Sequence, residues 1–165
     1  MSQLPEENIT CNYCENAVAE SDDYCQNCGS LFVENFYCEK HPSTEAEGVC
    51  VICRTPYCGQ CAEYANKVFL CAIHDGYEIY QGMARVYGVS DDAMAQYAHG
   101  ILEQAGLHPF IYSRKASPLS VGGPGYTLFR ASGEYDGHLI NELKVMVPCS
   151  EVIEADRILN DLGIV

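Results

Sequence analysis

Basic side chains are scarce in this chain and absent from its beginning. No lysine or arginine occurs before Lys40, whereas eight acidic residues do. Over all 165 residues, 9 basic and 23 acidic side chains give a formal net charge of −14. Binding to the phosphates of DNA or RNA needs a basic stripe or patch. We therefore expect the N-terminal region to repel nucleic acid, and we expect a protein partner instead.

Long apolar segments are also lacking. No stretch approaches the roughly 18 apolar residues that indicate a membrane-spanning helix. Residues 1–7 are acidic and have no apolar run of the kind found in a secretory signal peptide. We therefore expect a soluble protein of the cytoplasm, with no membrane partner.

Cysteine, by contrast, is abundant and regularly placed. Ten of the 11 cysteines and two of the five histidines form six pairs, and two residues separate the members of every pair. A secreted disulfide scaffold is the alternative for such a chain, but this spacing is typical of metal sites. Four ligands complete one tetrahedral zinc site, so the pairs predict three zinc ions per chain. The pairs are Cys11/Cys14, Cys25/Cys28, Cys38/His41, Cys50/Cys53, Cys58/Cys61 and Cys71/His74.

The first two cysteine pairs predict a zinc ribbon over residues 1–35, in which each pair forms one knuckle. Gly29 follows the second knuckle directly, where a positive φ is commonly needed. Leu31 and Phe32 are expected to cover the small core of the ribbon. Iron can also occupy a site of four cysteines, and ligand softness alone does not choose between the two metals.

Residues 36–78 carry the other eight ligands. Their spacing, Cys38-x2-His41-x8-Cys50-x2-Cys53-x4-Cys58-x2-Cys61, resembles a B-box zinc finger. The resemblance implies a cross-brace and a role in protein interaction; some B-boxes stand beside a ubiquitin ligase finger, which this chain lacks. The last pair departs from the family pattern, which usually ends in two histidines after a shorter gap. The implied ligand sets are Cys38, His41, Cys58 and Cys61 for one ion, and Cys50, Cys53, Cys71 and His74 for the other.

Residues 79–165 predict an α+β domain. Apolar runs predict strands at residues 83–89, 109–112, 126–129 and 143–147. A helix after the first strand would be capped by Ser90 and ended by Gly106, and a last helix would be capped by Ser150 and ended by Gly163. The expected apolar faces comprise Met94, Tyr97, Ala98, Ile101, Leu102 and Ala105 in the first helix, and Val152, Ala155, Leu159 and Leu162 in the second.

The order of these elements predicts a sandwich with the helices on one face of a mostly antiparallel sheet. Residues 101–107, 145–148 and 155–159 resemble a bacterial family of signal-transducing domains whose function is unknown. The resemblance implies a ferredoxin-like or nitrogen-regulator-like fold. That family has no established catalytic residue to transfer.

The sequence predicts no enzyme. Twelve ligands fill three sites, so no zinc keeps an open position for a reactive water. His99, His108 and His138 are interpreted as surface or capping residues. Cys149, near a helix N-terminus, is either a small residue at a corner of the chain or a redox or modification site.

Residues 113–130 form a segment with basic but no acidic residues. Its cations, Arg114, Lys115 and Arg130, either belong to a solvated loop or bind a small anionic effector. Together these patterns favour a zinc-binding adaptor or regulator that acts through protein–protein interaction, including self-association into a homo-oligomer. The alternatives are a ligase-like or enzyme-accessory recruitment module and a thiol-based redox or zinc sensor.

We predict no measurable binding to DNA or RNA at physiological salt, because the N-terminal modules have no basic patch that could neutralise phosphates. A gel-shift assay of the zinc-loaded chain with duplex DNA and with RNA checks this. A retarded band whose affinity falls steeply with added salt would contradict the electrostatic argument.

Overall fold

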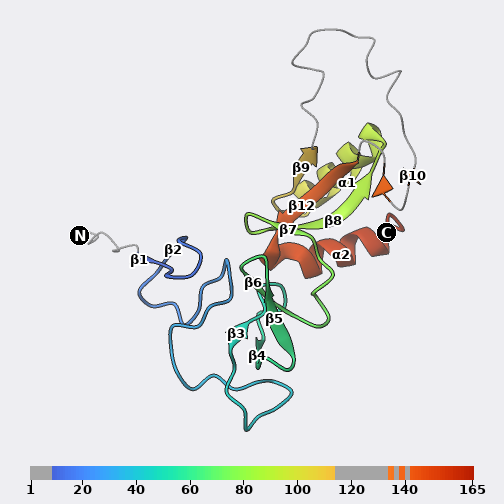
Figure 1. Ribbon diagram of the computed structural model, residues 1–165. Coiled ribbons are helices and arrows are strands. Elements are labelled where there is room, and N and C mark those ends of the chain that lie inside the picture. The colour runs from blue at the N-terminus through green and yellow to red at the C-terminus, as the bar shows by residue number, and fades with distance from the viewer. Residues whose placement is uncertain (1–8, 114–133, 136–137, 140–141) are drawn as a thin grey trace, which may run out of the picture. The chain divides into compact units, whose positions relative to one another are not determined.

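The computed structural model describes residues 9–113, 134–135, 138–139 and 142–165 (Figure 1). The chain divides into two compact units, Met1–Gly82 and Met83–Val165. All six Cys/His pairs lie in the first unit. Within the described residues, no helix has the length and apolar character needed to cross a membrane. The predicted strand at 126–129 and the cations Arg114, Lys115 and Arg130 lie outside the described residues.

The first unit is built from short antiparallel hairpins. Its strands pair as β1 (Ile9–Thr10) with β2 (Ala17–Val18), β3 (Gly48–Val49) with β4 (Pro56–Tyr57), and β5 (Ala62–Ala65) with β6 (Val68–Cys71). A hairpin of this size is at best marginally stable alone in water. The unit therefore depends on contacts beyond its strand pairing.

Three of the six pairs form the same tight turn. In each, the N–H of the residue after the second cysteine donates to the carbonyl of the first cysteine at 2.8 Å. That following residue has a positive φ, which is 64° in Glu15, 81° in Gly29 and 57° in Arg54. The positive φ predicted for Gly29 is confirmed. Glu15 and Arg54 adopt the same left-handed conformation at a cost of about 1–2 kcal/mol each. The geometry of the turn therefore outweighs the preference of these two residues for a negative φ.

One buried ring joins the first cysteine turns to the rest of the unit. The side chain of Phe69 is fully buried, at 0% exposure. A Cβ atom built at Gly29 would lie 2.9 Å from Phe69, and one built at Gly48 would lie 2.7 Å from it. Phe69 also donates a backbone hydrogen bond to the Cys28 carbonyl at 2.9 Å, and Val49 donates to the Gly29 carbonyl at 2.8 Å. The two predicted zinc modules thus lie against each other and are joined by backbone hydrogen bonds.

The apolar side chains of the ribbon contribute less to this core than the sequence predicts. Leu31 is half-buried, and Phe32 is 41% exposed, so Phe32 does not cover the ribbon core. Val18 packs against the buried ribbon cysteines instead, and Phe69, Tyr64 and Tyr13 form a row of aromatic rings. The ring centroids lie 4.9 Å apart for Tyr64 and Phe69 and 4.8 Å apart for Tyr13 and Tyr64, within the range of favourable aromatic pairs.

An antiparallel sheet in the order β7-β8-β12-β9 underlies the α+β region. Its strands are β7 (Ile79–Tyr80), β8 (Met83–Val89), β9 (Phe110–Ser113) and β12 (Leu143–Pro148). β12 lies antiparallel to both β8 and β9, so these two are parallel and α1 (Asp92–Gln104) connects them. β10 (Glu134–Tyr135) pairs with β11 (His138–Leu139), which places His138 in a strand.

Two helices pack on this sheet, and their buried faces are narrower than predicted. α1 and α2 (Val152–Asp161) both contact β8 and β12, and they contact each other. The fully buried residues are Ala95, Ala98 and Leu102 in α1 and Val152, Ala155 and Leu159 in α2. The prediction is wrong for Met94, Tyr97 and Leu162, which are 39%, 55% and 52% exposed, and for Ala105, which is also exposed. The buried faces therefore comprise only part of each predicted stripe.

The helix ends differ from the predicted ones at their N-termini. Asp91, and not Ser90, caps α1, because its Oδ1 accepts the Met94 N–H at 2.9 Å. Ser150 does not cap α2; it lies in a 3-10 turn, Cys149–Glu151, and α2 begins without a side-chain cap. The C-terminal predictions are confirmed, with a φ of 84° at Gly106 and 66° at Gly163.

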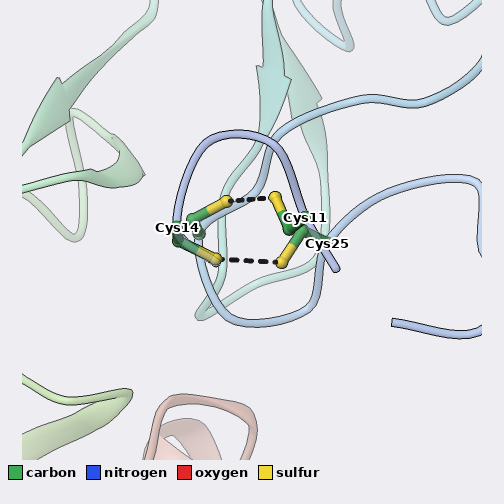
Figure 2. A group of neighbouring side chains, drawn as sticks. Cys11, Cys14 and Cys25 are labelled. Atoms are coloured by element: carbon green, nitrogen blue, oxygen red, sulfur yellow. Dashed lines mark hydrogen bonds between the residues drawn. The ribbon is translucent and has the colours of Figure 1, made fainter. Parts of the chain in front are cut away.

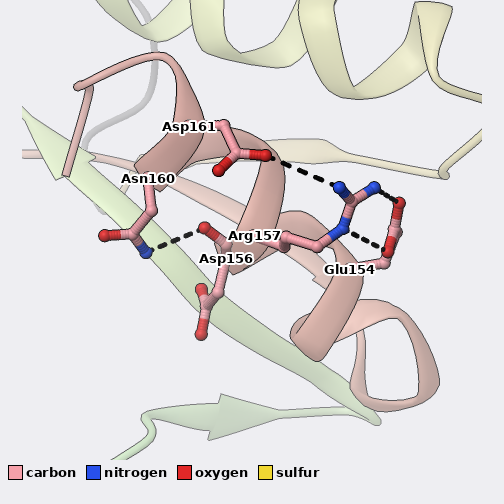
Figure 3. Close-up of polar contacts among 5 residues, drawn as sticks. All are labelled: Glu154, Asp156, Arg157, Asn160 and Asp161. Atoms are coloured by element: carbon pink, nitrogen blue, oxygen red, sulfur yellow. Dashed lines mark hydrogen bonds and ion pairs between the residues drawn. The ribbon is translucent and has the colours of Figure 1, made fainter.

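The exposed side of α2 carries a small charge network (Figure 3). Arg157 Nε donates to Glu154 at 3.0 Å, and its Nη1 lies 3.5 Å from Asp161 Oδ2. The hydrogen bond and charge of Arg157 lower the pKa of Glu154. Asn160 donates to the Asp156 carbonyl at 2.8 Å. Exposed pairs of this kind add little stability, so the buried face holds the helix in place.

We predict that Gly29→Ala destabilises the first unit by at least about 2 kcal/mol. The new Cβ would lie 2.1 Å from the Val49 carbonyl oxygen, at a φ of 81° that disfavours side chains. Gly76→Ala is the matched control in the same unit, because a Cβ added there would meet nothing within 4 Å. Thermal unfolding followed by the tyrosine near-ultraviolet signal should separate the two variants. Equal behaviour of the two would contradict the proposed close packing.

Candidate metal centres

Twelve Cys and His side chains converge into three groups of four. Within each group, one ligand atom per residue lies within 4.8 Å of all the others. We call the groups the ribbon site, site A and site B. They comprise Cys11, Cys14, Cys25 and Cys28 in the ribbon site, Cys38, His41, Cys58 and Cys61 in site A, and Cys50, Cys53, Cys71 and His74 in site B.

The ribbon site has the spacing of a tetrahedral thiolate site. Figure 2 shows Cys11, Cys14 and Cys25 pointing toward one another. The Sγ atoms of Cys11 and Cys28 lie 3.7 Å apart, and those of Cys14 and Cys25 lie 3.5 Å apart. Two sulfur ligands at about 2.3 Å from one zinc, at the tetrahedral angle, would lie about 3.8 Å apart. Two of the sulfur–sulfur distances therefore match a single zinc ion, and all four sulfur atoms lie within 4.8 Å of one another.

Sites A and B each add one imidazole to three sulfur atoms. His41 Nδ1 lies 3.7, 3.4 and 3.4 Å from the Sγ atoms of Cys38, Cys58 and Cys61. In site B, the distances from His74 Nδ1 are 3.6 Å to Cys50 and 3.2 Å to Cys71. A nitrogen at about 2.0 Å and a sulfur at about 2.3 Å from one zinc would lie about 3.5 Å apart. Both histidines thus present Nδ1 as the ligand atom.

The grouping in space is interleaved along the chain. Residues 36–78 contain four consecutive Cys/His pairs. Site A is formed by the first and third of these pairs, and site B by the second and fourth. This is the cross-brace that the resemblance to a B-box finger implied. The Cys71/His74 pair, which departs from the B-box pattern, joins Cys50 and Cys53 all the same. A longer gap before the last pair is accommodated by the β5–β6 hairpin, which returns the chain to site B.

The electrostatics of each group favour a divalent cation. Cys50 and Cys53 share a hydrogen bond that raises the pKa of Cys50 and lowers the pKa of Cys53 to about 4. In site A, burial and the neighbouring sulfur atoms raise the pKa of Cys61 to about 11. Thiols this close cannot all ionise beside one another. A bound cation removes this conflict because it favours the thiolate at every ligand.

A small polar residue supports each of the three tight turns, two positions after the second cysteine. These residues are Asn16, Ser30 and Thr55. Each carbonyl accepts the N–H of the first cysteine at 2.8 to 3.0 Å, and each backbone N–H hydrogen-bonds to the second cysteine and favours its thiolate. At Cys28, burial outweighs this hydrogen bond and raises the pKa. The two-residue spacing within the Cys/His pairs does not point to these residues. A small polar residue two positions after the second cysteine of all three turns is nevertheless a signal in the sequence.

Asparagine side chains reinforce the ribbon site further. Asn16 Nδ2 lies 3.4 Å from Cys14 Sγ. Burial opposes ionisation of Cys14, but hydrogen bonds from Asn16 and Asn27 prevail and bring its pKa to about 6. Residues that hydrogen-bond to a metal ligand and stabilise its charged form raise the affinity of the site for metal.

The other candidate residues do not join a site. Burial raises the pKa of the Cys149 thiol to about 11, which is opposite to the lowering expected for a reactive thiol. His108 Nδ1 lies 2.6 Å from Glu151 Oε1, and the His108 N–H donates to the same carboxylate at 2.7 Å. His99 belongs to none of the ligand groups found among the described residues.

Comparisons with known proteins give no match: no family model, curated protein or solved structure matches this chain. The sites are therefore interpreted from their own geometry.

We predict that paired substitutions will distinguish interleaved from sequential metal sites. C38A/C58A removes two ligands of site A, whereas C38A/C50A removes one ligand from each of sites A and B. Because a site short of ligands binds its metal more weakly, native mass spectrometry with a competing chelator should show one ion lost from C38A/C58A and two from C38A/C50A. The unsubstituted chain should hold three. The reverse pattern would establish sequential pairing.

Proposed function

We propose that this chain is a zinc-stabilised, non-enzymatic adaptor or regulator that acts through protein–protein interaction. The observation that carries the proposal is the closure of the three groups, each with four protein ligand atoms within 4.8 Å. Thiolate and imidazole ligands in a tetrahedron suit zinc. A zinc ion with four protein ligands stabilises a fold and has no position for a reactive water.

The surface of the first unit supports a protein partner. Residues 1–82 include 13 acidic and 3 basic side chains. Several large apolar side chains are exposed beside them, including Tyr13, Phe32, Tyr37 and Ile73, at 41% to 69%. Acidic charge disfavours nucleic acid, whereas exposed aromatic and aliphatic groups are typical of protein interfaces.

The second unit is proposed to be a ferredoxin-like regulatory domain. Its β8-α1-β9 unit, with β12 inserted antiparallel between the two parallel strands, is the split β-α-β arrangement of that fold. We assign this unit the role of receiving a second partner, a second copy of the chain or a small effector. The zinc modules supply the primary protein contact.

We predict that a chelator abolishes partner capture while leaving the second unit folded. Metal binding free energy is folding free energy in modules of this size, whereas the second unit buries its own core of strand and helix side chains. Hydrogen exchange should show loss of protection at residues 10–76 and retained protection across the described part of 83–163. An affinity pull-down of the zinc-loaded full chain from bacterial cytoplasm, with the chelated chain as control, tests the function.

Two results would contradict this proposal. If protection collapsed uniformly along the chain, the two units would be one cooperative structure. If zinc-loaded and chelated chains captured the same proteins, the zinc modules would not be the interaction surface.

A further inference from the structure

The three metal sites differ in the ligand that they expose to solvent. In the ribbon site and in site A, three ligands are buried and the second ligand along the chain is half-buried. That half-buried ligand is Cys14 in the ribbon site and His41 in site A. A thiolate sulfur is oxidised to a sulfenic acid or a disulfide where an oxidant reaches it, and an imidazole forms neither. The ribbon site therefore presents an oxidisable atom that site A keeps buried.

A second sulfur lies beside the half-buried one. Cys14 Sγ lies 3.5 Å from the Sγ of Cys25, which belongs to the other knuckle of the ribbon (Figure 2). A disulfide bond has a length of about 2.05 Å, so the two sulfur atoms would approach by about 1.5 Å to form one. Tyr13, Glu15 and Asn16, which flank Cys14 in the sequence, are all exposed. A small oxidant in solvent can therefore reach Cys14, and Cys25 stands next to it as a second thiolate.

We propose that Cys14 and Cys25 are an oxidant-sensitive thiol pair, which a peroxide converts to a disulfide with release of the ribbon-site metal, while site A keeps its metal. This inference goes beyond the proposed function and holds whether or not the first unit binds a protein. Site B exposes one sulfur and one imidazole, those of Cys53 and His74, so site A is the reference against which the ribbon site is compared.

The reaction takes two steps and consumes one hydrogen peroxide. The Cys14 thiolate attacks one peroxide oxygen, the O–O bond breaks and hydroxide leaves, which turns the sulfur into a sulfenic acid. The Cys25 thiolate then attacks that sulfur, so that the S–S bond forms, the S–O bond breaks and a second hydroxide leaves. The two thiolates lose two electrons to the peroxide, and both hydroxides take a proton from solvent to give water.

The disulfide removes half of the ligands of the ribbon site. Only Cys11 and Cys28 then remain as thiolates, and two ligands do not complete a tetrahedral zinc site. The ion is therefore held weakly and leaves. In site A the same reaction would have to begin at a buried sulfur, since Cys38, Cys58 and Cys61 are 1%, 3% and 8% exposed.

The test treats the zinc-loaded full chain with a few equivalents of hydrogen peroxide. Native mass spectrometry should show zinc lost together with two hydrogen atoms of the chain. Peptide mapping after alkylation should find Cys14 joined to Cys25, with Cys11 and Cys28 alkylated. The three cysteines of site A should become open to alkylation at least about tenfold more slowly than Cys11 and Cys28, because exposure governs the rate of thiol oxidation.

Two reciprocal substitutions exchange the half-buried ligand between the sites. Cys14→His gives the ribbon site an imidazole in place of its accessible sulfur, and His41→Cys gives site A an accessible sulfur at the two-residue spacing of the other pairs. In peroxide, C14H should keep its ribbon-site zinc, and H41C should lose zinc from site A. The control C149S removes the one cysteine outside the three sites and should react like the unsubstituted chain.

Zinc content before peroxide shows that each variant is loaded at its sites. Equal rates of zinc loss from the ribbon site and site A of the unsubstituted chain would overturn the proposal, and so would a disulfide that omits Cys14. Rapid loss from the ribbon site of C14H would overturn it as well. If C14H does not hold three zinc ions at the outset, H41C decides, because a site A that still resists peroxide would show that the exposed ligand does not control oxidation.

Discussion

Charge compensation at the three Cys/His groups is the constraint on which the first unit depends. The groups hold ten cysteines and two histidines, and ten thiolates would carry more negative charge than three divalent ions neutralise. One divalent cation in each group would nevertheless remove most of this charge and would link segments that are far apart in the sequence. The strands of this unit are two to four residues long, too short to hold a core by pairing alone. Metal–ligand bonds would therefore supply the cross-links that a larger hydrophobic core provides elsewhere.

The three sites are also connected to one another through the backbone around Phe69. The Phe69 N–H donates to the carbonyl of Cys28, a ribbon-site ligand, and the Phe69 carbonyl accepts from Val51, next to the site B ligand Cys50. The Ala72 N–H, beside site B, donates to the Cys61 carbonyl of site A at 3.2 Å. Distortion at one site is thus passed directly to the next. We infer that the sites form one cooperative structure, although the sequence reads as two modules.

The sequence predicted the ligand groups well because their chemistry depends on residue type and spacing. All twelve ligands and the positive φ of Gly29 follow from such local rules, whereas the interleaving of the last eight ligands comes from the resemblance to a B-box finger. The strand at Met83–Val89 follows equally from its apolar run. The errors in the predicted helices arise where tertiary contacts, and not sequence periodicity, determine which side chains are buried or cap the helix. Tyr97 fits the helical period of α1 but lies outside a contact made by small alanines, and Asp91 takes the cap from Ser90 because its side chain reaches the Met94 N–H.

The features that the sequence did not reveal are formed by segments between the ligands. Phe69 gives no sign in its own hairpin that it will fill a space beside Gly29 and Gly48, since that contact depends on how three sites orient their loops.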